Sequence, residues 1–477
     1  MSDKLPYASS CILKSAKISS VKGDKTLDIT DLVYRFDYFE NISMPTVSAK
    51  LTLVDAGANL IASLPIQGFE EVELSLEASD EETYNYKMRV YKIDSRFSGD
   101  RFQTYSLGLI SEEALLNEGV RVAKTLKDKP DKIVKDLLQK YLKTQKQIIA
   151  DPAVYNIVFN PGKKSPFGII DSIKLKSVPT GGNVDPKTSK NKNKFDTGGN
   201  KTDVTSSVPP VSNADYTKTK GTSGYMFFEN RNGYVFKSID SLCSTNKYNA
   251  SAPVAVYTQE NNDIGGPPTR KILDIDFVEE IDIMTKLRLG AFSSLICFYN
   301  YSTGKYEEHV YSLADSYDIM GHSGSQKGLP YGQKELSKYP TRIMSALLDH
   351  ETWYNGTDIA SPEKEDGATG STTNFPDFQK YYMSQSIARV NSLINQTVKI
   401  TVTGNPKLMA GDKIEIKIPN QIPSANRIGE PYDTEHSGVY LISEVNHAFI
   451  PKKKLSTTYL TLIRDSYGSP TSSSKVQ

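Results

Sequence analysis

The chain has 477 residues, 38% of them hydrophobic, which suits roughly two to four domains with ordinary cores. Its net charge of +1 gives no overall field that would attract nucleic acid or an anionic membrane. No stretch approaches the ~20 apolar residues of a transmembrane helix, and the N-terminus lacks the order of a secretory signal. Cys11, Cys243 and Cys297 are too few and too widely spaced for a disulfide framework or a zinc site. We expect them to be small core side chains in a chain made in a reducing cytosol.

The first ~110 residues predict antiparallel strands. In residues 47–54 every second side chain is apolar, which indicates a strand with one buried and one wet face. Similar patterns predict strands at 27–39, 72–76, 87–97 and 104–110. Several such strands separated by turn residues favour a barrel or a sandwich.

The pattern then becomes helical. Pro130 suits a first helical turn, and Ile133, Leu137 and Tyr141 follow at intervals of four. Ser165 and Pro166 predict a second helix start, as N-cap and first helical residue.

Residues 178–222 are rich in Lys, Thr, Ser, Asn, Gly and Pro, so we predict a flexible surface loop. After it, residues 225–236 predict a hairpin, with Asn232-Gly233 as a type I′ turn. A short helix is expected at 384–393, and further strands are expected at 252–257, 295–301, 306–313, 398–403, 413–418, 438–445 and 457–463. Two β-barrel-like blocks, one near each end of the chain, would result.

The sequence offers little sign of catalytic chemistry. None of the five histidines has a metal-binding spacing, and His447 is expected to be a hydrogen-bonded structural residue within a strand. The segment from Gly321 to Ser325 fails the G-x-S-x-G pattern of a nucleophile elbow at its last position. No phosphate-binding glycine loop occurs, and adjacent acids such as Glu112-Glu113 are typical of a solvated face. We therefore predict no catalytic residue, no cofactor and no metal.

Several segments, in the same order along the chain, together resemble the baseplate hub proteins of contractile-tailed (T-even-like) bacteriophages. They are Pro45 with Ala49 to Asp55, Leu64 to Gly68 before the strand at 71–76, the helix led by Pro166, Phe227 to Leu242, Gly290 to Ser294 with Tyr299 and Tyr306, Val402 to Leu408 with Gly411-Asp412, and Ser437 to Ile442 with His447. The loop 178–222 and an insertion near 316–393 depart from the pattern.

The resemblance implies a β-rich α+β fold with two tube-like antiparallel β-barrel domains and helical or mixed connector and insertion domains. The expected domains are a first barrel at 1–112, a connector at 113–257, an interrupted second barrel at 258–315 and 394–468, an insertion at 316–393 and a tail at 469–477. Three chains would present six similar barrels in a pseudo-sixfold ring.

The resemblance further implies a structural subunit located in the tail baseplate of the virion and assembled in the host cytoplasm. Its expected partners are two further copies of itself, a central spike protein, tail tube or tube-initiator proteins and baseplate wedge proteins. DNA would pass through the ring without sequence-specific binding, and no membrane contact is expected. Two loops are candidate interfaces: Leu64, Pro65, Ile66, Gln67 and Gly68, and Asn405, Pro406, Lys407, Leu408, Gly411 and Asp412. These turns could equally serve only to close their own barrels.

Three other interpretations remain open. The first is the spike-hub protein of a type VI secretion or bacteriocin system, although those chains usually continue into a long β-helical spike. The second is a tail-associated enzyme that degrades the cell wall. The third is a carbohydrate-binding β-protein, for which the single tryptophan, Trp353, is a weak basis.

Overall fold

The computed structural model describes residues 9–57, 64, 66–78, 82–99, 102–153, 155–179, 222–244, 251–259, 270–279, 282–301, 304–317, 320–324, 326, 328–347, 353–354, 376–420 and 432–468. The predicted flexible loop at 178–222 lies almost wholly outside this part of the chain, and the tail at 469–477 lies wholly outside it. Within it the protein is β-rich with fewer helices, as the predicted α+β class requires.

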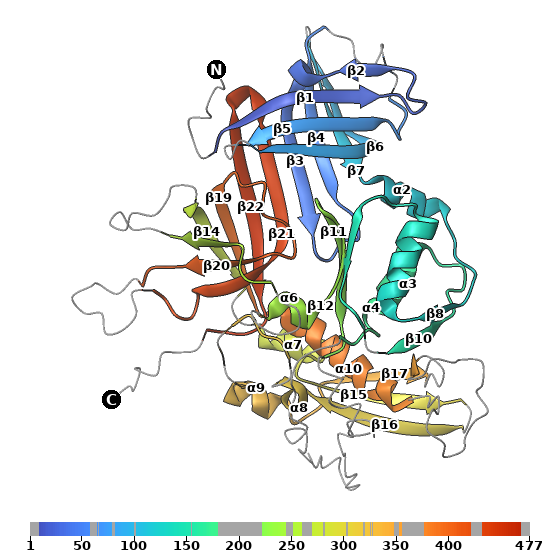
Figure 1. The fold of residues 1–477 in the computed structure, drawn as a ribbon. Coiled ribbons are helices and arrows are strands. Elements are labelled where there is room, and N and C mark those ends of the chain that lie inside the picture. The colour runs from blue at the N-terminus through green and yellow to red at the C-terminus, as the bar shows by residue number, and fades with distance from the viewer. Residues whose placement is uncertain are drawn as a thin grey trace.

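One large sheet dominates the molecule (Figure 1). Its main path, in pairing order, is β14 (Ile272–Glu279), β19 (Gln396–Thr403), β22 (Leu455–Arg464), β21 (Gly438–Ile450), β3 (Val33–Asn41), β4 (Ser48–Asp55), β7 (Gln103–Ile110), β6 (Thr83–Ser98), β5 (Glu71–Ala78), β1 (Cys11–Ser19) and β2 (Thr26–Asp28). A side branch adds β20 (Lys413–Lys417), which pairs with β21, and β13 (Ala255–Thr258), which pairs with β20.

The sheet consists of two halves, one from each end of the chain. They meet where β3 pairs with β21, for example Asp37 with Ala448. Each half curls around its own core: residues such as Leu51 and Leu107 fill the first, and Ile400 and Leu462 fill the second. Among the described strands no continuous ladder closes a ring, although isolated bridges of Ser10 to Leu455 and of Thr258 to Lys271 bring strands of each half close together. The prediction of two barrels is therefore not confirmed, although each half is strongly curled.

A mixed α/β unit packs beside the junction of the two halves. Its sheet joins β11 (Tyr225–Asn230) and β12 (Gly233–Ser238) to β9 (Gln147–Ala150), and a second small sheet holds β8 (Leu126–Asp128), β10 (Asn156–Phe159) and β18 (Trp353–Tyr354). The helices are α2 (Glu112–Gly119), α3 (Pro130–Asp136) with a π-turn at Leu137–Tyr141, α4 (Pro166–Lys174) and α6 (Ile239–Cys243).

Local signals predicted these helices well. Pro130 and Pro166 begin α3 and α4 as expected. The Ser165 hydroxyl caps α4 by accepting a hydrogen bond of 3.4 Å from the Gly168 amide.

The turn of the β11–β12 hairpin differs from the predicted type I′ turn. Asn230 pairs with Gly233, so Arg231 and Asn232 form the turn, and neither has positive φ. Gly233 has a φ of 134°, and a Cβ on it would lie 2.1 Å from the Gln147 carbonyl oxygen. The glycine is thus required by the close approach of β9 and not by the turn itself.

The region between the two parts of the second half forms its own small domain. β16 (Lys305–Ser312), β15 (Ser293–Asn300) and β17 (Arg342–Leu347) form a sheet, accompanied by α7 (Ile283–Leu289), α8 (Leu313–Ser316), α9 (Tyr331–Leu336) and α10 (Pro376–Leu393). We expected 293–312 to belong to the second barrel. Ile296 and Phe298 instead pack against Met383 of α10, which draws β15 and β16 away from the large sheet.

Candidate functional site

The solvent face of the large sheet runs without a break across the junction of its halves. One registered row of side chains is Ser48, Phe39, Asn446, Tyr459, Thr401 and Asp274, and the next is Asn41, Glu444, Thr461, Lys399 and Asp276. We call these two rows the seam rows. They border a hollow of about 650 Å³ on this face. Most of their members are polar, as expected of a sheet face exposed to water.

Positive charge on this face is neutralised locally. Arg35 Nε lies 2.7 Å from Asp37 Oδ2, and Asp94 accepts from both Lys50 and Lys92 at 3.1 and 2.8 Å. Lys399 pairs in register with Asp276 on the neighbouring strand. These ion pairs leave little uncompensated positive charge on the described part of this face, and strong binding of phosphates depends on such charge.

The large sheet has a free edge at the far half of β6. β5 reaches only to the pairing of Glu71 with Arg89, so no described strand covers the outer edge of residues 91–98. Side chains there are exposed on both faces, and Phe97 is 63% exposed. An uncovered edge that carries exposed apolar side chains is a natural place for another strand to pair.

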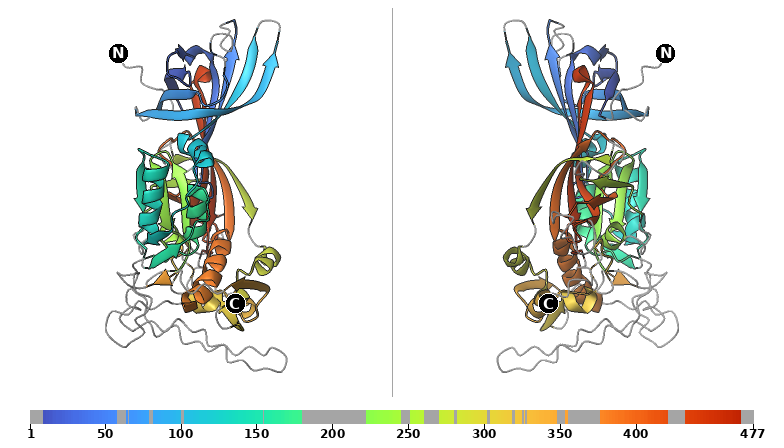
Figure 2. Two further views of the ribbon diagram at one scale, coloured as in Figure 1. Left: turned by 90° about the vertical axis from the view of Figure 1, so that its right-hand side faces the viewer. Right: turned by 90° about the vertical axis from the view of Figure 1, so that its left-hand side faces the viewer.

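β14 provides a second free edge at the opposite end of the path. It pairs with β19, and on its other side the described residues show an isolated bridge from Thr258, the last residue of β13, to Lys271, just before β14 begins. Leu273, Phe277 and Val278 are exposed on it. Figure 2 shows β14 and the β6–β7 hairpin projecting from the body on the same side, with the solvent face between them.

The two free edges run in opposite directions. From β14 through β19, β22, β21, β3, β4 and β7 to β6 the path has eight strands, and every neighbouring pair is antiparallel. With an even number of alternating strands, the last must be antiparallel to the first. β6 of one molecule could therefore pair with β14 of another and continue the same alternation.

The predicted interface turn at 405–412 faces largely inward. The Glu40 carboxylate on β3 accepts the Ala410 amide at 2.7 Å and the Arg231 amide at 2.6 Å. The Arg231 guanidinium donates to the Pro406 carbonyl at 2.8 Å. A Cβ on Gly411 would lie 2.5 Å from the Phe228 ring, and the Leu408 carbonyl accepts from His447. Burial raises the pKa of Glu40 to about 7 despite these hydrogen bonds. The turn joins both halves to the hairpin.

Other groups of this turn also have partners within the chain. The Asn405 side chain donates to the Tyr257 hydroxyl at 2.9 Å, and Lys407 lies 2.9 Å from Glu82. Asp412 accepts the Met409 amide, and burial raises the pKa of Asp412 to about 6.

The other predicted loop, at 64–68, lies away from the first. Leu64 is buried in the first core, Ile66 packs against that core, and the amides of Gln67 and Gly68 donate to Glu70. Pro65 lies outside the described residues. This loop precedes β5, whereas Lys407 contacts Glu82 beyond the other end of that strand, so the structure does not bring the two loops together.

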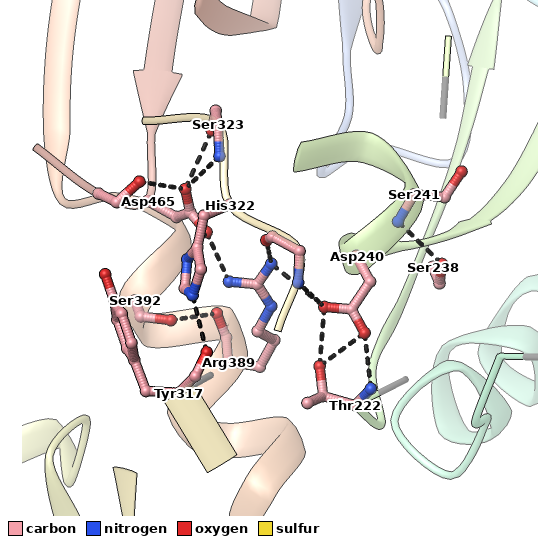
Figure 3. Close-up of polar contacts among 12 residues, drawn as sticks. Thr222, Ser238, Asp240, Ser241, Tyr317, His322, Ser323, Arg389, Ser392 and Asp465 are labelled. Carbon is pink, nitrogen blue, oxygen red and sulfur yellow. Dashed lines mark hydrogen bonds and ion pairs between the residues drawn. The ribbon is translucent and has the colours of Figure 1, made fainter. Parts of the chain in front are cut away.

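A buried charge cluster joins the small domain to the second half (Figure 3). Arg389 of α10 lies 2.8 Å from Asp465, which follows β22, and 3.4 Å from Asp240 of α6. His322 Nδ1 lies 2.9 Å from the same Asp465 carboxylate. Burial alone would raise the pKa of Asp465, but His322 and Arg389 outweigh it and hold that pKa far below its ordinary value.

Gly321 to Gly324, the described part of the segment that fails as a nucleophile elbow, belongs to this cluster, and Ser325 lies outside the described residues. The Gly321 amide donates to Asp240 and the Ser323 amide donates to Asp465, both at 2.9 Å. A Cβ on Gly321 would lie 2.5 Å from the Asp240 carbonyl oxygen, so its glycine reflects close packing. Arg389 could not be predicted as a member of this cluster, because nothing in the local sequence distinguishes a buried arginine in a helix from an exposed one.

His447 is a buried strand residue with two hydrogen bonds, as predicted. Its ring nitrogens lie 3.0 Å from the Thr458 hydroxyl and 3.0 Å from the Leu408 carbonyl. Within the described residues, no group of three or more His, Cys, Asp or Glu is placed to hold a metal ion. Nor does any helix in that part of the chain have the length and apolar character needed to cross a membrane.

No family model and no curated protein sequence matches the chain. Among solved structures it is similar to a tail protein from Neisseria meningitidis, with 12% identity, 94% of this chain and 96% of that chain covered, and a TM-score of 0.48. It is also similar to a 43 kDa prophage tail protein from Shewanella oneidensis, with 8% identity, 96% and 100% coverage and a TM-score of 0.45. An Escherichia coli component of the type VI secretion system matches with 10% identity, 96% and 78% coverage and a TM-score of 0.39.

Proposed function

We propose that this chain is a structural hub subunit in the baseplate of a contractile phage tail. Three copies form a pseudo-sixfold ring that joins the tail tube to a central spike and leaves a channel for DNA. Residues 1–112 and the two segments 258–315 and 394–468 are proposed to supply the ring units, except that β15 and β16 (Ser293–Ser312) belong to the small domain.

The observation that carries this proposal is the open eight-strand antiparallel path with a free edge at each end. Pairing β6 of one copy with β14 of the next is a head-to-tail contact, and such contacts give either closed rings or filaments. Each copy contributes two curled half-sheets, so three copies place six similar units around one axis. The alternation of strands then continues unbroken around the ring.

The solvent face of the sheet supports its use as the channel wall. It carries few cations, and Arg35, Lys50 and Lys92 each have an acid beside them. DNA could pass such a wall without being held. Replacing Asp276 and Glu444 with lysine is expected to slow DNA ejection from assembled particles, and an unchanged ejection rate would count against the channel.

The proposed partners are two further copies of the chain, the central spike protein, tail tube or tube-initiator proteins, and baseplate wedge proteins. The proposed location is the baseplate of the virion, after assembly in the host cytoplasm. The free edges β6 and β14 are stronger candidates for the contact between copies than the turn at 405–412, because most polar groups of that turn are already satisfied within the chain.

The test is the absolute mass in solution, measured by light scattering with and without neighbouring tail proteins. A mass near three times 52.9 kDa, alone or with the spike protein, is the expected result. A chain that stays monomeric with every tail partner overturns the ring. Peptidoglycan zymography then tests the enzyme alternative.

A further inference from the structure

The hollow on the solvent face lies where the two halves of the large sheet meet. It is lined by residues of β14, β19, β22, β21 and β3, together with Met44 and Ser48. We propose that it binds an extended peptide segment in which basic and apolar side chains alternate. The hollow is formed within one chain, so this inference does not rest on the proposed ring.

One side of the hollow is apolar. Phe39 and Tyr459 flank Asn446 in the first seam row and are 36% and 43% exposed, and Met44 near them is 57% exposed. When an apolar side chain covers aromatic rings that are open to water in a concavity, the free energy of the system falls and binding is favoured.

The other side of the hollow is acidic. Of the four acids among the lining residues, Glu40 is buried and accepts the Ala410 amide, whereas Asp274 and Asp276 of β14 and Glu444 of β21 face one lining cation, Lys399. Glu444 is held in place because the Asn41 amide and the Thr461 hydroxyl donate to it at 2.6 and 3.0 Å. Three carboxylates against one ammonium leave the hollow with an excess of negative charge. A cationic ligand is therefore favoured and a phosphate chain is repelled.

The spacing of the two sides selects the form of the ligand. Asp274 and Asp276 are two residues apart on one strand, roughly 6.6 Å, which is also the repeat of side chains along one side of an extended peptide. A peptide lying over β19, between β14 and β22, would direct every second side chain to these acids. The intervening side chains would point toward Tyr459 on β22. Alternation of basic and apolar residues satisfies both sides at once.

The test is fluorescence anisotropy of the full chain with a labelled Lys-Leu-Lys-Leu-Lys-Leu peptide. Binding that weakens as salt rises is expected, because the acidic side contributes through exposed charges. The double variant Asp274→Asn/Asp276→Asn is expected to bind roughly tenfold more weakly. Tyr459→Ser should weaken binding while leaving the salt dependence in place. Asp136→Asn, which removes an exposed acid of α3, is the matched control and should not change binding.

Three results would overturn the inference. They are equal binding by the double variant and the control, equal binding of a Glu-Leu peptide, and binding of a neutral oligosaccharide in place of the peptide. Ring formation is read from mass and peptide binding from anisotropy, so either proposal can fail while the other stands.

Discussion

Arg389 holds together parts of the molecule that are far apart in the sequence. It is fully buried between Asp465 and Asp240, and its removal would leave Asp240 without its ion-pair partner and Asp465 with His322 alone. Breaking a buried ion pair by removing one partner typically costs 3–5 kcal/mol, since a buried charge is left uncompensated. We expect Arg389→Met to lower the free energy of unfolding by about that amount in urea denaturation.

Lys140→Met is the matched control for this prediction. Lys140 pairs with Asp136 on the surface, where the two side chains are 67% and 55% exposed. Exposed pairs contribute little, so the control should unfold like the unchanged protein. Equal stability of Arg389→Met and Lys140→Met would mean that the cluster does not tie the small domain to the sheet.

His447 predicts how stability depends on pH. Burial lowers its pKa to about 4, because a charged ring cannot be hydrated there. Between pH 6.5 and 4 the unfolded chain therefore binds a proton at this residue that the folded chain does not. The free energy of unfolding falls as the pH drops through this window.

His447→Gln should remove this contribution. The loss of stability between pH 7 and pH 5 is expected to be about 2 kcal/mol smaller in the variant than in the unchanged protein. Urea denaturation of both proteins at both pH values measures this loss of stability. The contributions of the other titrating groups are the same in the two proteins and cancel in the comparison. Identical pH dependence in both proteins would contradict the buried, neutral ring.

At the scale of elements, the residues that begin helices and alternate along strands could be predicted from sequence. Pro130, Ser165 and residues 47–54 act through neighbours in the chain, and each formed the expected element. The hairpin turn could not be predicted in detail. A glycine is needed at position 233 because β9, more than eighty residues earlier in the chain, packs directly against it. No local sequence pattern indicates that contact.

Gly233→Ala tests this explanation. Its Cβ would clash with the Gln147 carbonyl oxygen and would also face a φ of 134°. We expect a loss of at least about 2 kcal/mol in the free energy of unfolding. Gly119→Ala is the control, because a Cβ there meets nothing within 4 Å. Equal stability of the two variants would show that β9 moves aside freely.

At the scale of the molecule, the alternation of apolar and polar residues predicted two β-rich blocks, but it did not predict which strands pair between them. The pairing of Asp37 with Ala448 spans almost the whole chain, and periodicity within a strand says nothing about its neighbour. For the same reason the sequence drew attention to the turns at 64–68 and 405–412. Turn residues stand out in a sequence, whereas the free edges of β6 and β14 appear only when the order of strands is known.

The free edges yield the last prediction. Ile93 on β6 and Phe277 on β14 are 42% and 36% exposed, so lysine at either position should leave the fold of one chain intact. Charges on edge strands hinder pairing with a further strand. Ile93→Lys and Phe277→Lys should each abolish the trimer measured by light scattering with the spike protein, without changing thermal unfolding of the separate chain. Ile343→Lys, on the exposed face of the small sheet, is the control and should still form trimers. If Ile343→Lys alone prevents assembly, the copies meet through the small domain and the edge-to-edge ring is wrong.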